Sequence, residues 1–350
     1  MKFILVFAGA ALLMLQACAT TGPGTPDTAP VNNDPLIGQI IDSQNKSNLS
    51  FDTLVERLLA HDVIYLSEKH DNPVHHAAQH RIIQALINQG QNPVIGFEFF
   101  AMDDTSLLLS LVDSRQAGHD RETETALEKK MRNKLGWADQ TDTMWKYYWD
   151  LLRLARDNGL WAAGLDLDDS LKRRITRKGH HGLTSLEQSQ LFSTHLSDPV
   201  YETYMKKIFK QVHCGMGNDR MLSRLYDTWL ARNDKMAQSI TQLFQAAGKS
   251  SPPKGPLVII MGNGHTEYKL GVMDRVQAIF PGASQVNLSL SEVFAEPQPL
   301  GTYLAPLDLA GYPKSMPADY IWFTGRVSNQ DPCDKFRHVI ERMKKKKKQE

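Results

Sequence analysis

The sequence has almost no excess of charge, since its 350 residues include 40 Lys and Arg against 39 Asp and Glu, a net charge of +1. Nucleic-acid binding draws on many basic side chains that neutralise phosphates, so this balance predicts no nucleic-acid partner. The hydrophobic fraction of 41% is ordinary for a globular protein, which argues against a chain that is disordered throughout. With only 3 cysteines, the fold must rest on a hydrophobic core and not on a disulfide scaffold.

The N-terminus lacks a run long enough to cross a membrane. Phe3 to Met14 is a stretch of 12 apolar or small residues, whereas a spanning helix needs about 20. A single lysine before so short a run is typical of a secretory signal peptide. The next four residues, Leu15-Gln16-Ala17-Cys18, resemble the bacterial lipobox, whose cysteine becomes the lipidated first residue. We therefore expect a signal peptide over 1–17 and a palmitate-bearing Cys18; the alternative is an ordinary signal peptide with an incidental cysteine.

The residues after Cys18 predict the location of the protein and its division into a tether, a folded domain and a tail. Ala19 in place of Asp resembles outer-membrane sorting, so we expect a lipid-anchored protein on the periplasmic face of the outer membrane. Residues 18–35 have little to bury and predict a flexible tether. A folded domain over 36–330 and a helix-compatible tail over 331–350 follow. The tail ends in five consecutive lysines, which are either a solvated end or a contact for lipid phosphates.

Short apolar runs alternate with longer helical patterns, which predicts an α/β fold: a mostly parallel central sheet flanked by helices. The predicted strands are 63–66, 94–99, 161–165, 257–261, 285–290 and 320–324. The predicted helices are 74–89, 121–133, 142–158, 185–195, 199–212, 219–247 and 267–279. The stretch from about 168 to 250 has no convincing strand, so we expect a helical insertion there. Cys214 and Cys333 could pair in an oxidising periplasm, but the sequence does not decide this.

Polar side chains follow three of the predicted strands. Glu68 and His70 end the first, Glu98 lies near the end of the second, and His265 follows Gly262-Asn263-Gly264 after the fourth. Because sites gather at the carboxyl ends of parallel strands, we expect these four residues to converge. Two carboxylates and two imidazoles suit a divalent metal or acid–base catalysis. The alternative is structural, with Glu98 paired to a buried Lys or Arg.

Four motifs occur in order between about residues 50 and 290. They are Ile64–Pro73 with His75-His76, Gly96–Phe100, His213–Gly215 with Arg232–Ala237, and Gly262–His265 with Gly271-Val272. Together they resemble the motifs of the ChaN-like haem-binding uptake lipoproteins, in the wider superfamily of erythromycin esterases and Tiki- and TraB-type proteases. Ser67 stands where that family usually has Gly, and Asp166 where it usually has Asn.

The resemblance implies haem and iron handling at the outer membrane. It implies a homodimer around two stacked haems, a tyrosine on each iron, and a histidine and a lysine from the partner chain on the propionates. Tyrosinate is an accepted axial ligand of haem iron. The candidates are Tyr148, which we favour, then Tyr147, both in the aromatic stretch 145–149, with Tyr268 as the rival; the alternative is that this stretch is helix core. For the propionates we expect His76 or His75 with Lys69 or Lys146.

The first functional prediction is therefore a haem-binding outer-membrane lipoprotein that acts beside a haem receptor, with haem iron as its cofactor and no reaction required. The second is a periplasmic metal-dependent hydrolase that uses Glu68, His70, Glu98 and His265 with a divalent metal. A third is a scaffold whose strand-end cluster has no function. The sequence favours the first because an aromatic-rich helix suits a haem site and is not needed by a hydrolase.

Overall fold

The computed structural model describes residues 33–113, 121–250, 254–331 and 333–334. The predicted signal peptide, Cys18, most of the tether and most of the C-terminal tail lie outside these residues and stay predictions. None of the described helices combines the length and the apolar character of a membrane-spanning segment.

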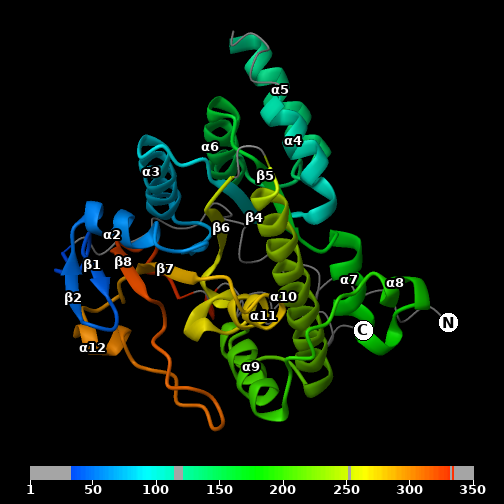
Figure 1. Cartoon of the computed structure of the whole chain (residues 1–350). Helices are drawn as coiled ribbons and strands as arrows, with labels where there is room; N and C mark the ends of the chain where they lie inside the picture. Colours follow the sequence, from blue (N-terminus) through cyan, green and yellow to red (C-terminus); the bar gives the residue numbers. More distant parts are fainter. Residues whose placement is uncertain (1–32, 114–120, 251–253, 332, 335–350) are drawn as a thin grey trace.

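An eight-stranded sheet runs through the middle of the described chain in the order β2-β1-β8-β7-β3-β6-β4-β5 (Figure 1). The six strands from β3 to β8 pair in parallel, and β1 is antiparallel to both β8 and β2. The bounds are β1 Ile40–Asp42, β2 Ser47–Leu49, β3 Val63–Glu68, β4 Val94–Ala101, β5 Ala162–Asp166, β6 Leu257–Gly262, β7 Gln285–Glu292 and β8 Tyr320–Thr324. The predicted α/β class and all six predicted strands are confirmed, whereas the two short edge strands β1 and β2 were missed.

Helices cover both faces of the sheet, and alternate residues of each central strand contact opposite layers. In β3, Ile64 and Leu66 pack in one core with α2 (Phe51–Leu58), α3 (Pro73–Asn88), α4 (Thr105–Asp113) and α6 (Asp142–Asn158). Val63 and Tyr65 pack in a second core with α10 (Asp219–Gly248) and α11 (Val272–Ile279). The central strands are therefore buried on both faces, which explains why they read as continuous apolar runs.

The insertion between β5 and β6 is helical, as predicted. It contains α7 (Asp169–Lys178), α8 (Ser185–Ser189), α9 (Pro199–Val212) and α10, and α10 runs alongside the sheet in Figure 1. The remaining helices of the described chain are α5 (Arg121–Lys134) and α12 (Leu300–Tyr303). Cys214, in the turn after α9, forms a disulfide with Cys333, which answers the question that the sequence left open.

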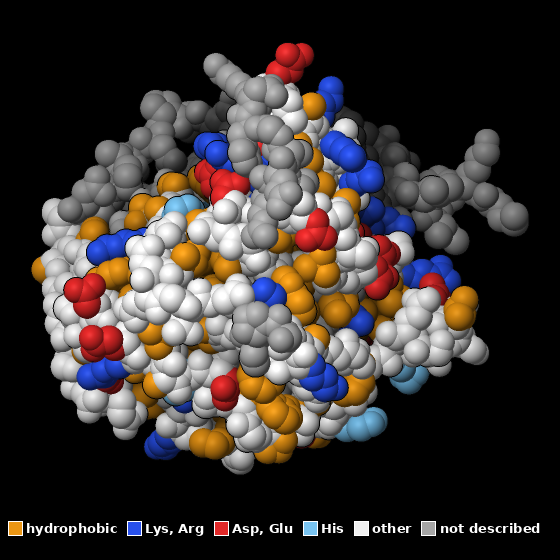
Figure 2. All heavy atoms as spheres, turned by 45° about the horizontal axis from the view of Figure 1, so that its top comes forward, with side chains coloured by type: hydrophobic (Ala, Val, Ile, Leu, Met, Phe, Trp, Pro, Cys, Tyr) orange, Lys and Arg blue, Asp and Glu red, His pale blue; other side chains and the backbone are white. Residues whose placement is uncertain are grey.

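Two predicted helices have the wrong bounds. The helix expected over 185–195 ends at Ser189. The helix expected from 267 begins only at Val272, because Tyr268 and Lys269 have positive φ angles of 59° and 62° and break the helical path. Two 3₁₀ turns, Asn263–His265 and Glu267–Lys269, take its place, so the helix start expected near Thr266 is absent. On the face drawn in Figure 2, acidic and basic side chains are interspersed, in keeping with the balanced charge.

Candidate functional site

Glu68, the last residue of β3, is the centre of a buried polar cluster. Its Oε1 accepts a 2.5 Å hydrogen bond from the Tyr148 hydroxyl and lies 3.1 Å from Nδ1 of His70. Its Oε2 accepts a 2.6 Å bond from Nε2 of Gln79 and lies 3.3 Å from Nδ1 of His76. Burial acts to raise the pKa of Glu68, but His76, His70 and Tyr148 outweigh it and hold the pKa below its usual value. Glu68 is therefore an ionised carboxylate inside the protein.

A second carboxylate, Glu98 of β4, lies at the neighbouring strand ends. Its Oε1 accepts a 2.6 Å bond from Nη2 of Arg232 and lies 3.2 Å from Nε2 of His265, while Oε2 accepts a 2.7 Å bond from the Gly262 amide. Burial acts to raise the pKa of Glu98, but His265 and Arg232 outweigh it and hold the pKa well below its usual range. Glu98 therefore pairs with an arginine, as the structural alternative expected, although Arg232 is partly and not fully buried.

Arg232 ties this carboxylate to a third one. Its Nε donates to Oδ2 of Asp166 over 2.9 Å, and Nζ of Lys172 donates to the same oxygen over 2.9 Å. Asp166 is the last residue of β5, so α7 and α10 of the insertion each contribute a cation to the strand ends. Neither Arg232 nor Lys172 was predicted to be a site residue. Arg232 begins the Arg232–Ala237 motif, which could have pointed to it, whereas Lys172 had no signal beyond its place on the helix after β5.

His70 lies between the two carboxylates. Its ring meets Phe99 edge-on, with 4.5 Å between centroids, and a Cβ atom built on Gly262 would be only 2.8 Å from Cε1 of His70. Glycine at 262 is therefore what lets β6 approach this ring. Burial acts to lower the pKa of His70, but Glu68 and Glu98 outweigh it and raise it. The structure thus brings together the three predicted strand ends that carry Glu68, His70, Glu98 and His265.

The cluster does not have the form of a metal centre. Each carboxylate oxygen of Glu98 already accepts a hydrogen bond from within the protein. Among residues 33–113, 121–250, 254–331 and 333–334, no group of three or more His, Cys, Asp or Glu side chains is arranged to hold a metal ion. The hydrolase alternative is therefore not favoured by this arrangement.

Gln79 also belongs to the cluster, through its bond to Glu68, and was not predicted from the sequence. It lies one helical turn after His76 and thus on the same face of α3.

The two tyrosines of α6 have different surroundings. Tyr148 is fully buried among Phe99, Phe100 and Trp137, and burial together with Glu68 raises its pKa well above the usual range. Tyr147 is only partly buried, and its ring stacks on that of His76 with 4.5 Å between centroids and 17° between planes. Burial raises the pKa of Tyr147 as well, with a smaller contribution from Asp71.

The aromatic stretch of α6 is otherwise helix core. Trp145, Tyr148 and Trp149 are 1%, 0% and 3% exposed, so the packing alternative holds for these three residues. Tyr268 lies elsewhere: its amide donates to the carbonyl of Pro317, and burial, with Glu267 and Tyr204 of α9, raises its pKa to about 12.

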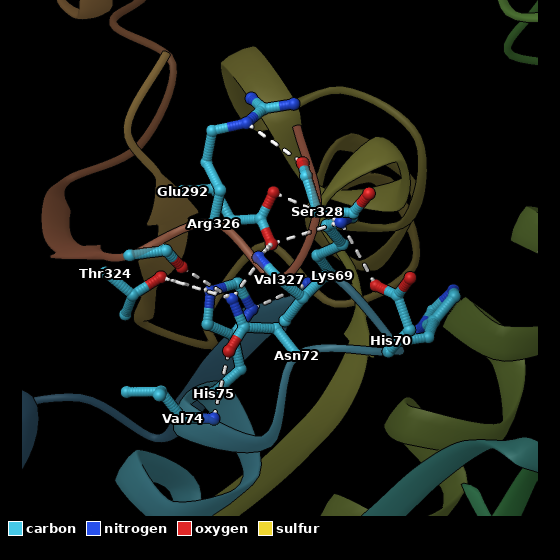
Figure 3. A network of polar contacts seen from close by, with 12 residues as sticks. Lys69, His70, Asn72, Val74, His75, Glu292, Thr324, Arg326, Val327 and Ser328 are labelled. Carbon is cyan, nitrogen blue, oxygen red and sulfur yellow. Dashed lines mark hydrogen bonds and ion pairs between the residues drawn. The ribbon is translucent and has the colours of Figure 1, made fainter. Parts of the chain in front are cut away.

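Lys69 and His75 belong to a separate network that joins the loop after β3 to the ends of β7 and β8 (Figure 3). His75 accepts from the Lys69 amide through Nδ1, and its Nε2 lies 2.9 Å from the Thr324 hydroxyl. Burial lowers its pKa to about 3, so the ring is neutral at neutral pH. Nζ of Lys69 lies 3.1 Å from both carboxylate oxygens of Glu292 and 3.2 Å from Asp71.

Glu292 is the acceptor on which this network depends. Besides Lys69, its Oε1 accepts from Nδ2 of Asn72 and from the Val327 amide, each over 3.0 Å. Both ring nitrogens of His75 are therefore engaged in contacts within the fold, whereas the side chain of Lys69 is 42% exposed. Lys146 is more exposed, at 68%, and pairs with Asp150 on its own helix.

The sequence and the fold of this chain are similar to those of known proteins. A family model described as "Haem-binding uptake, Tiki superfamily, ChaN" matches residues 54–276, more than half of the chain. No curated protein matches the sequence. Among solved structures, "Cofacial heme binding to ChaN of Campylobacter jejuni" is similar at a TM-score of 0.58 and 20% identity, over 83% of this chain and 96% of that one.

Two further solved structures are less similar to this chain. A mutant of the erythromycin esterase EreC is 10% identical over 81% of each chain, with a TM-score of 0.41. The type III effector HopBA1 is 12% identical over 87% of this chain and 99% of its own, also with a TM-score of 0.41. Likeness at this level carries no argument about function.

Proposed function

The chain belongs to the family of haem-binding uptake proteins of the Tiki superfamily, ChaN, and we propose that it is a haem-binding lipoprotein that takes part in haem uptake at the outer membrane. The observation that carries this proposal is the family match over 54–276, together with a partly exposed tyrosine beside the strand-end cluster. The printed name of the Campylobacter jejuni structure describes cofacial haem binding, and the fold similarity to it supports the same ligand class here.

We infer that Tyr147, and not Tyr148, is the ligand of the haem iron. A phenolate oxygen suits Fe(III), but the ligand must reach a porphyrin and lose its proton. The hydroxyl of Tyr148 is fully buried and donates to Glu68, so it meets neither condition. Tyr147 is partly exposed and is held in place by its stacking on His76, whose Nε2 is fixed 2.9 Å from the His70 carbonyl oxygen. The residues present therefore fit a tyrosine-ligated haem.

For the propionates, Lys69 is the candidate that the geometry supports best. It is the exposed cation on the loop that leads into α3, and Lys and carboxylate form charge-assisted hydrogen bonds. Both ring nitrogens of His75 are occupied, and His76 is only 5% exposed with Nδ1 facing Glu68. Glu292 and Asp71 compensate the charge of Lys69, so a propionate would compete with them for the ammonium group.

A homodimer and a membrane anchor complete the proposal. Tyr147 is only partly buried, so a haem held there would be exposed to solvent unless a second copy of the chain covered it. The lipobox-like residues ending at Cys18 support attachment to the outer membrane. The Cys214–Cys333 disulfide supports an oxidising compartment such as the periplasm, because disulfides persist there and are rare in the cytosol. An outer-membrane haem receptor is the expected partner.

Haemin titration tests the ligand assignment. We expect the wild-type chain to give a shifted Soret band and the charge-transfer band of an Fe(III)–tyrosinate, and to shift toward dimer in size-exclusion chromatography. Tyr147→Phe should lose the charge-transfer band, whereas Tyr148→Phe should keep it. The reverse pattern would assign the iron to Tyr148. Unaltered spectra in both variants would remove both tyrosines as ligands, and free haemin with the wild-type chain would overturn haem binding itself.

A further inference from the structure

Lys69 faces two carboxylates with a single ammonium group. Its Nζ lies 3.1 Å from both carboxylate oxygens of Glu292 and 3.2 Å from Oδ1 of Asp71. An ammonium group has three N–H donors and no acceptor, so these three oxygens surround all of its donors. A carboxylate of a ligand can therefore bind Lys69 only by displacing one of the two residues.

Glu292, at the end of β7, is the partner that is firmly held. Its side chain is only 9% exposed, and its Oε1 also accepts hydrogen bonds from Nδ2 of Asn72 and from the Val327 amide (Figure 3). Displacing Lys69 from Glu292 would leave a buried charge without its counter-ion, which is costly. The contact between Glu292 and Lys69 therefore persists when a ligand binds, and it fixes the position of the ammonium group.

Asp71 is the partner that is weakly held. Its side chain is 39% exposed, and its Oδ1 accepts no well-aligned hydrogen bond from the described residues, although Nζ of Lys69 is near. An exposed ion pair of this kind contributes little to stability. Asp71 lies in the loop after β3, directly before Asn72, which caps α3. Its side chain can therefore turn into solvent while β3 and α3 keep their places.

Asp71 also lies near the tyrosine to which we assign the haem iron. Burial raises the pKa of Tyr147, and the negative charge of Asp71 raises it further, which requires the carboxylate to be close to this phenol. Asp71 contacts Lys69 in turn, so Tyr147, Asp71 and Lys69 follow one another along the same part of the surface. A ligand that is held at Tyr147 and carries carboxylates can therefore reach Lys69 from the side on which Asp71 lies.

We propose that Asp71 is the exchangeable partner of Lys69, which a carboxylate of the bound porphyrin replaces, while Glu292 remains as the fixed partner. One carboxylate takes the place of another, so the exchange needs no further cation. It makes the site specific for porphyrins with free carboxylates, and it keeps the affinity below the value that Lys69 would give without Asp71. This inference rests on the proposed function, because it requires a porphyrin to bind beside Lys69.

Titrations with haemin and with haemin dimethyl ester, in which both carboxylates are blocked, test the exchange by absorbance. We expect the wild-type chain to bind haemin about tenfold more tightly than the ester, and Lys69→Gln to lose this preference. Asp71→Asn should raise the affinity for haemin about two- to fivefold, as expected for the loss of an exposed competing ion pair, and leave the affinity for the ester unaltered. In the Lys69→Gln background, Asp71→Asn should raise the haemin affinity clearly less.

Asp150→Asn is the matched control. Asp150 is 41% exposed, pairs with Lys146 and lies three residues after Tyr147, so this change removes the same charge at a similar exposure. It should leave the haemin affinity close to that of the wild type. Equal gains in Asp71→Asn and Asp150→Asn would reduce the effect to local charge and overturn the exchange, as would an equal gain with and without Lys69.

The wild-type titrations separate this inference from the proposed function. Equal affinities for haemin and its dimethyl ester would overturn the exchange and leave haem binding in place. A wild-type chain that binds neither compound would overturn the proposed function, and the exchange with it.

Discussion

Replacing Arg232 with methionine should destabilise the protein strongly, because this guanidinium bridges two buried carboxylates. The side chains of Glu98 and Asp166 are 4% and 0% exposed and accept from Arg232 over 2.6 and 2.9 Å. Removing one partner of a buried ion pair costs about 3–5 kcal/mol, because it leaves an uncompensated charge. Two features favour the lower end of this range of costs. Arg232 is 25% exposed, so water can solvate the carboxylates in its place, and Asp166 keeps its contact with Lys172.

We therefore expect Arg232→Met to lower the free energy of unfolding by about 3 kcal/mol, measured by urea denaturation with circular dichroism and tryptophan fluorescence. Arg173→Met is the matched control, because Arg173 is half exposed and lies 3.6 Å from an exposed carboxylate, Asp169. That pair should contribute less than about 1 kcal/mol.

Adding Glu98→Gln to Arg232→Met should restore part of the lost free energy of unfolding, because the amide removes one of the two carboxylate charges that Arg232 compensated. If Arg232→Met and Arg173→Met are equally stable, the argument that the strand-end carboxylates depend on Arg232 is wrong. If Glu98→Gln gives no recovery in the double variant, the cost arises from altered packing and not from unpaired charge.

Three further outcomes follow from the same contacts. In the folded state the pKa of Glu98 is well below its usual value of 4.5, so its ionised form stabilises the protein fully above pH 4.5, and this contribution is lost as the pH falls through the folded pKa. Unfolding curves between pH 7 and pH 3 should show the loss, with a smaller fall in Glu98→Gln; a flat profile would contradict it. Gly262→Ala should destabilise by about 1–3 kcal/mol and shift the ring resonances of His70, because the added methyl group meets that ring; unchanged resonances would refute the contact. Cys214→Ser/Cys333→Ser should cost about 2–5 kcal/mol, since the bond closes a long loop, and an unaltered melting temperature under oxidising conditions would show that the bond does not form.

Several features were predictable because they depend on local pattern. The buried strands β3, β4 and β6 read as apolar runs, and α6 and α9 matched their predicted bounds, since Thr141 and Asp198 cap their first turns through side-chain oxygens. β1 and β2 were missed because they are only three residues each, and because the sheet reaches them only through the pairing of β1 with the distant strand β8. The local sequence also gave no indication of the positive φ angles of Tyr268 and Lys269, because these accompany tertiary contacts such as the hydrogen bond from the Tyr268 amide to the Pro317 carbonyl.

The sequence alone determined the α/β class, the family and the convergence of Glu68, His70, Glu98 and His265, because parallel strands must bring their carboxyl ends to one edge of the sheet. Which tyrosine is accessible was decided only by the tertiary structure. Tyr147 and Tyr148 are neighbours in the chain, but the 100° turn per residue of α6 points one toward the sheet and Glu68 and leaves the other against His76 at the surface. The partner of Cys214 was likewise decided only by the tertiary structure, which brings it to Cys333, 119 positions away along the chain.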